Sequence, residues 1–172
     1  MTSNDIKLKI NLKSEFEHLK HLIIITLITF TIIFTFLFYY DIPFIALLIL
    51  IYYLVFNLFP VLILHNNYEK HNKNKPLIFS ESYLLFENKK FMYDDIININ
   101  IYGTHQSINK NSVGILPYQS EYLYIEILNN KNEKLILTSL YSTELEKIIN
   151  KKISSKNINW IIVSFPKIKN YS

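Results

Sequence analysis

The hydrophobic and polar positions divide the chain into two unlike parts. Residues 22–64 are almost wholly apolar, whereas residues 65–157 mix apolar and polar positions in short segments. As helices, the apolar stretches 22–40 and 42–64 would reach roughly 28 Å and roughly 34 Å, enough to cross a hydrocarbon core of about 30 Å. The pattern therefore predicts a two-helix transmembrane hairpin after a cytosolic N-terminal segment, residues 1–21.

The turn between the two apolar stretches is short and carries no lysine. It reads Asp41-Ile42-Pro43, and so short a turn makes the helices antiparallel. Pro43 suits the first turn of the second helix, because a backbone N–H at that position would make no hydrogen bond within the helix and its loss costs nothing. Lysines instead flank the other ends of the stretches: Lys7, Lys9, Lys13, Lys20, Lys70, Lys73 and Lys75. The positive-inside rule then predicts that both termini are cytoplasmic.

Asn57 is the one strongly polar side chain within the spans. An amide in hydrocarbon needs a hydrogen-bond partner, and such bonds hold membrane helices together. We expect Asn57 to contact Thr26 or Thr29 of the other helix, with a second protein chain as the alternative partner.

The polar part begins with a linker, residues 65–76, and continues with alternating segments typical of strands. Ile97, Ile99 and Ile101 are expected on one face of a strand and Ile96 on the other. Thr143 and Glu146 have the spacing of a capping box, which predicts a helix over 143–153. The expected strands are 77–80, 83–87, 90–93, 96–102, 122–128 and 134–138. Residues 77–157 thus form a small α+β domain in this reading, an antiparallel sheet closed by one C-terminal helix.

For two regions the sequence is compatible with two alternative structures. Residues 103–120 are either a long loop or a loop with one short strand at 112–116, and the expected docking site for a partner is this loop, with Gly103, His105, Gly114 and Tyr118. The tail, residues 158–172, is either an added strand or a segment that lies at the membrane interface and is anchored by Trp160.

This order of elements resembles bacterial membrane-anchored pleckstrin-homology-like (PH-like) proteins, in particular the YcxB-like type. The features that match are the strand pair within 83–93, the segment Tyr93-Asp94-Asp95-Ile96 and the closing helix 143–153. The resemblance covers about residues 15–153 and implies a bent antiparallel sheet, nearly a barrel, capped at one end by the helix. Such folds serve mostly as binding platforms, and fold alone does not define function.

Composition narrows the chemistry. The chain has no cysteine and no arginine, so disulfides, cysteine-ligated zinc and bidentate arginine sites are excluded. Its abundant Asn, Ile, Lys and Tyr are typical of an AT-rich bacterial genome, which makes the bacterial cytoplasmic (inner) membrane the expected location. The net charge of +4 arises largely from lysines beside the apolar spans, so we expect no nucleic-acid partner.

No catalytic or phosphate-binding motif occurs in the sequence, and we expect no enzyme activity, cofactor or metal. His18, His21 and His65 would lie at similar depth, and we interpret them as polar interfacial side chains rather than metal ligands. Five lysines are candidates for contacts with anionic lipid headgroups, the alternative being solvated side chains near the leaflet. These are Lys20, Lys70, Lys73, Lys89 and Lys90.

Three functional hypotheses follow. The first is a non-catalytic interaction or regulatory module that displays a PH-like domain at the inner leaflet to a protein partner. The second is a bacterial immunity protein that protects against a cognate toxin. The third is a small component of an oligomeric transporter or channel, in which Asn57 would act within a homo-oligomer.

Overall fold

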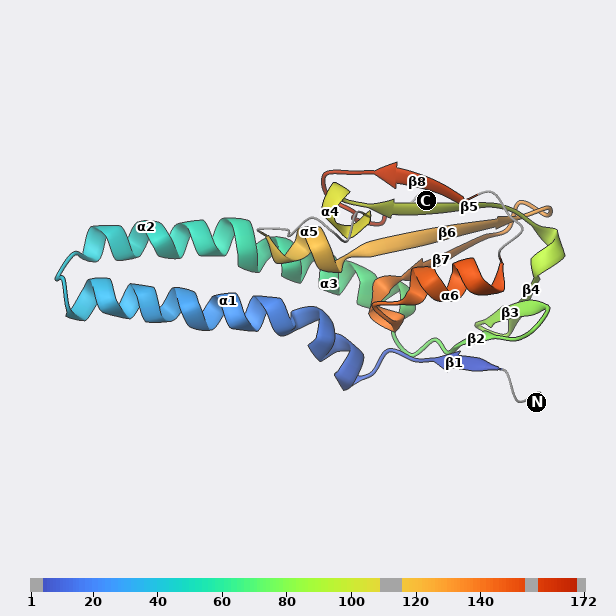
Figure 1. The fold of residues 1–172 in the computed structure, drawn as a ribbon, viewed down its shortest axis with the longest axis horizontal. Helices are drawn as coiled ribbons and strands as arrows, with labels where there is room; N and C mark the ends of the chain where they lie inside the picture. The colour runs from blue at the N-terminus through green and yellow to red at the C-terminus, as the bar shows by residue number, and fades with distance from the viewer. Residues whose placement is uncertain (1–4, 109–115, 154–157, 170–172) are drawn as a thin grey trace.

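The computed structural model describes residues 5–108, 116–153 and 158–169, and it has an elongated shape, with a helical hairpin at one end and a sheet-rich domain at the other (Figure 1). The helices are α1 (Leu12–Phe38), α2 (Pro43–Tyr53), α3 (Phe59–Asn72), α4 (His105–Ile108), α5 (Pro117–Glu121) and α6 (Leu145–Lys152). The strands are β1 (Ile6–Leu8), β2 (Leu77–Phe79), β3 (Tyr83–Phe86), β4 (Lys89–Met92), β5 (Ile96–Gly103), β6 (Leu123–Asn129), β7 (Lys134–Thr138) and β8 (Ile158–Ile162).

The hairpin consists of two long apolar helices. α1 begins at a capping box in which Asn11 and Ser14 each accept a hydrogen bond from the other's backbone N–H, and it continues without interruption to Phe38. The second helix runs from Pro43 to Asn72, and Pro43 stands in its first turn as predicted. Both are long and apolar enough to cross a membrane, which confirms that part of the prediction.

The second helix does not end where its apolar stretch ends. Residues 65–72, which the sequence analysis assigned to a linker, continue as helix α3 into the domain. Tyr68 and Asn72 are buried there, and the Asn72 amide donates a hydrogen bond of 3.0 Å to the Ile136 carbonyl at the edge of β7. Helix α3 therefore belongs both to the hairpin and to the domain core.

The described strands form two open four-stranded sheets rather than a closed barrel. The first has the order β1-β2-β3-β4 and is antiparallel, so the N-terminal segment contributes a strand in register with β2, Ile6 opposite Phe79. The second has the order β7-β6-β5-β8, and in it the tail forms β8 parallel to β5. The domain is thus α+β, as expected, but one of its strand pairs is parallel.

Strand β5 contains a bulge that the alternating pattern did not reveal. The register with β6 shifts between Ile96 and Asn98, because one extra residue is accommodated there. As a result Ile96 is buried with Ile99 and Ile101, whereas Ile97 is 53% exposed. The prediction that Ile97 shares the face of Ile99 and Ile101 is wrong.

Helix α6 closes the core as predicted but begins differently. Leu145, Ile149 and Ile153 are buried as one apolar stripe. The expected capping box of Thr143 and Glu146 is absent, because the N-cap residue is Glu144 and no side chain caps the helix. The Ser142 hydroxyl instead accepts a hydrogen bond from the Glu144 N–H at 3.1 Å, which ends the preceding turn.

The bulge can be tested by a matched pair of substitutions. Ile99→Ala should lower the free energy of unfolding of the domain by about 2–5 kcal/mol, because it leaves a cavity in the core. Ile97→Ala should change it by less than about 0.5 kcal/mol, since this side chain already faces solvent. Urea unfolding of the full chain in detergent micelles, followed by circular dichroism, measures both. Equal losses would contradict the bulge.

Candidate functional site

The interior of the hairpin contains one polar contact between the helices. The Thr26 hydroxyl donates to the Leu22 carbonyl at 2.7 Å, so the Tyr53 hydroxyl, 2.6 Å away, donates to Thr26. Tyr53 is 3% exposed and its ring meets Phe30 edge-on. The structure therefore places Thr26 at a helix–helix contact, with Tyr53 as its partner.

Asn57 lies one turn further along, in a π-helical turn, Leu54–Leu58, that precedes Pro60. Its side chain is buried and lines a cavity of about 240 Å³ together with Thr29, Ile25 and Leu116. Asn57 and Thr29 are thus brought together at one cavity wall. A hydrogen bond between Asn57 and either threonine stays a prediction.

The junction between hairpin and domain is built around Tyr122. The rings of His18, His65 and Tyr68 surround it, with centroids at 6.0, 6.3 and 5.5 Å. The Tyr122 hydroxyl shares a hydrogen bond of 3.2 Å with His65 Nδ1, while His18 Nδ1 donates to the Ser14 carbonyl at 2.8 Å. Burial raises the pKa of the Tyr122 hydroxyl, and the nearby Glu121 carboxylate raises it further, so this phenol stays neutral.

His21 does not join His18 and His65. Its Nδ1 lies 2.5 Å from the Glu121 carboxylate on α5, on the exposed surface. Within residues 5–108, 116–153 and 158–169, no cluster of three or more histidine or acidic side chains could hold a metal ion. The chemistry of this junction is packing and hydrogen bonding between helices and sheet.

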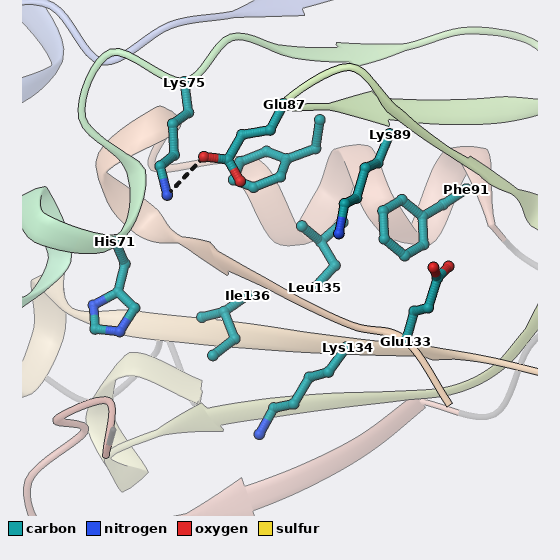
Figure 2. A pocket seen from close by; sticks show the side chains of 10 residues that line it. His71, Lys75, Glu87, Lys89, Phe91, Glu133, Lys134, Leu135 and Ile136 are labelled. Atoms are coloured by element: carbon teal, nitrogen blue, oxygen red, sulfur yellow. Dashed lines mark ion pairs between the residues drawn. The ribbon is translucent and has the colours of Figure 1, made fainter. Parts of the chain in front are cut away.

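A groove opens between the edges of the two sheets (Figure 2). It has a volume of about 340 Å³, and β4 and β7, its two walls, are each the last strand of their sheet. The floor is apolar, with Phe86, Phe91 and Leu135, and the rim is charged. The β3–β4 turn that shapes one end has Glu87 and Asn88 in the left-handed region, with φ of 49° and 65°.

The charges around the groove are unequally compensated. Lys75 pairs with Glu87 at 2.9 Å, and Lys134 pairs with Glu126 at 2.6 Å. Figure 2 shows the Lys89 ammonium pointing into the middle of the groove, and among the described residues no carboxylate pairs with it. Among the described residues, Lys89 is thus a cation without an ion-pair partner above the apolar floor, and Glu133, whose carboxylate accepts a hydrogen bond from the Asn129 amide at 2.7 Å, is an anion without one at the rim.

The five predicted lysines do not form one surface. Lys20 and Lys70 are exposed on α1 and α3, whereas Lys73 pairs with Glu69 at 2.5 Å and approaches Glu15 at 3.9 Å. Lys90 lies over the Tyr83 ring at 4.0 Å, and because β-strand neighbours point to opposite faces, it lies away from Lys89 and the groove. Lys89 and Lys90 could contact lipid headgroups together only if the membrane surface met both faces of β4.

The loop residues lie around two short helices. Gly103 ends β5, and a Cβ at this position would collide with the Ser107 hydroxyl of α4, so glycine is what permits this close packing. His105 begins α4, and Tyr118 of α5 meets the Phe165 ring at 5.7 Å. Gly114 lies outside the described residues, as do residues 112–115 of the alternative strand.

Sequence reasoning missed most of the groove. His71 and Lys75 were assigned to a linker and Glu133 to no element, and only Lys89 was named as a candidate site residue. The one sequence signal was the pair Glu87-Asn88 between two strands, which marks the tight hairpin that shapes one end of the groove.

No family model, curated protein or solved structure matches this chain. The candidate sites therefore rest on their own geometry.

The contact inside the hairpin predicts different effects for two adjacent tyrosines. Tyr53→Phe should weaken the association of the two helices by about 0.6 kcal/mol and at most by about 2 kcal/mol, because it removes the donor to Thr26. Tyr52→Phe, at an exposed position of the same helix, should have no effect. Unfolding of the reconstituted protein under steric trapping measures the difference, and equal effects would contradict the contact.

Proposed function

We propose that this chain is a non-catalytic, membrane-anchored interaction module whose groove between β4 and β7 binds an extended segment of a partner protein. The observation that carries the proposal is the uncompensated Lys89 in a groove bounded by two strand edges. Edge strands present backbone groups to which another strand can add, and peptide-recognition domains use this mode widely.

The chemistry of the groove favours a particular kind of segment. Apolar side chains of the partner would cover Phe86, Phe91 and Leu135, and a carboxylate would pair with Lys89. The Asn72 amide already occupies the Ile136 carbonyl, so added strand pairing would be limited to the other end of the β7 edge. The expected ligand is therefore a short extended segment with apolar residues and one acidic residue.

The domain is best regarded as a variant of the PH-like arrangement, with two open sheets and a closing helix α6. The hairpin would anchor it in the bacterial cytoplasmic membrane with both termini inside. The pairing of β1 with β2 supports an even number of crossings, because the segments before and after the hairpin share one sheet. Confinement to the membrane would raise the effective concentration of a membrane-bound partner.

Lys89 and Lys90 provide a matched test, because they are adjacent on β4 but face opposite sides. Lys89→Glu should reduce partner recovery strongly, since it opposes the partner's carboxylate, whereas Lys90→Glu should leave recovery near that of the unchanged protein. Detergent-solubilised pull-downs from the native cell, quantified by mass spectrometry, measure this for each protein recovered. Recovery lost equally in both variants, or in neither, would refute the groove as the binding site.

Topology is tested separately. A green fluorescent protein fused after Ser172 should fluoresce, because the fusion stays in the cytoplasm when both crossings are made. A periplasmic alkaline phosphatase fused at the same place should be inactive. A green fluorescent protein fusion that does not fluoresce, together with a phosphatase fusion that is active, would overturn the proposed orientation.

A further inference from the structure

The end of the domain nearest the hairpin carries apolar side chains that the domain leaves exposed. Ile162, at the end of β8, is 60% exposed, and Trp160 and Phe165 are 39% and 37% exposed. Figure 1 shows the end of β8 beside α4, at the end of the domain from which the hairpin extends, with α5 next to it. We call Leu116, Tyr118, Trp160, Ile162 and Phe165 together the membrane-proximal face.

Hydrogen bonds to α3 set the depth of this face. The Asn67 amide donates to the Ile168 carbonyl at 3.2 Å and accepts from the Ile168 N–H at 2.9 Å, and the Tyr68 hydroxyl donates to the Pro166 carbonyl at 2.7 Å. Asn67 comes three residues after Leu64, the end of the apolar stretch, which is a rise of about 4.5 Å. Since each headgroup layer is about 5–7 Å thick, the segment around Phe165 is held at headgroup level.

The membrane-proximal face is also continuous with the apolar surface of the hairpin. Leu116, just before α5, lines the cavity that contains Ile25 and Asn57, both within the apolar stretches. The other end of α5 is held beside the start of the first apolar stretch by the contact between Glu121 and His21. Tyr118 of α5 in turn meets Phe165, so α5 contacts both the hairpin and the tail through apolar side chains.

We propose that the membrane-proximal face lies in the headgroup–acyl boundary of the leaflet beside it and forms a second contact with the bilayer, in addition to the two helices. The inference rests on the proposed membrane anchor. Tryptophan, tyrosine and phenylalanine are the side chains that favour this boundary. The exposed Lys167 and Lys169 of the same tail would meet lipid phosphates, so the face combines apolar insertion with a basic border.

Such a contact would hold the domain in one orientation. Two helices can tilt in the bilayer together with the domain that is fixed to them, whereas an inserted edge at β8 would limit that tilt. The groove between β4 and β7 would then keep a constant direction relative to the membrane.

The absence of cysteine makes the proposal directly testable. Ile162→Cys and Ile97→Cys are a matched pair, since both positions are apolar, exposed and on the second sheet, and Ile97 lies at the opposite end of β5 from Gly103, the partner of Ile162. Each full-length variant is labelled with a polarity-sensitive nitrobenzoxadiazole probe and reconstituted in vesicles of phosphatidylcholine and phosphatidylglycerol. At position 162 we expect blue-shifted emission and severalfold stronger quenching by lipids brominated near the top of the acyl chain than at position 97.

Two results would overturn the proposal. A probe at position 162 that is quenched by aqueous iodide as readily as the probe at position 97 would show a face in water. A probe protected from both iodide and brominated lipid would show a face covered by protein, either a second copy or a partner. Flotation of the same vesicles separates these results from failure of the anchor, because a protein that floats with the vesicles but shows either result refutes this contact alone.

Discussion

The structure depends on one continuous helix that belongs to both parts of the molecule. From Pro43 to Asn72 the chain passes from an apolar stretch, most of whose side chains are exposed, into a domain whose core includes Tyr68 and Leu64. In the proposed membrane-anchored state, the hydrophobic effect would therefore stabilise the first part of this helix in lipid and the last part in the domain core. Tyr122 and its ring contacts with His18 and His65 lock the sheet against both helices at this transition. Hairpin and domain therefore cannot be separated without breaking the core.

The hairpin and most strands could be predicted because their signals are local. Two apolar stretches long enough to cross a membrane, and the alternation of apolar and polar residues with a period of two, can be recognised without knowledge of the rest of the chain. What could not be predicted are features decided by distant contacts. The bulge at Ile97 depends on the pairing of β5 with β6. The continuation of the helix through Tyr68 depends on burial of that side chain against the sheet. The pairing of Ile6 in a sheet depends on β2, which follows the hairpin in the sequence. Their sequences alone are equally compatible with a regular strand, a linker and a free N-terminal segment.

The candidate sites show the same division. Asn57 and Thr26 could be selected from the sequence because they are polar residues within apolar stretches. Tyr53, which hydrogen-bonds to Thr26, could not be selected in the same way, because it is one of 13 tyrosines in the chain. Lys89 could be located on a hairpin, but its difference from Lys90 arises only when β4 becomes an edge that faces β7. A groove between two sheets is a property of their arrangement, and no local pattern in β4 or β7 encodes it.

The pairing of β1 with β2 has a consequence for how the protein is made. Ile6 leaves the ribosome long before Phe79, and both helices are synthesised in between. The N-terminal strand must therefore stay unpaired until β2 has been synthesised, and in the proposed topology also until the chain has returned to the same side of the membrane. In the proposed topology, a chain that had made only one crossing would keep Ile6 and Phe79 on opposite sides of the membrane, and its first sheet would lack a strand. In that topology, the first sheet would thus be complete only in a chain that had made both crossings.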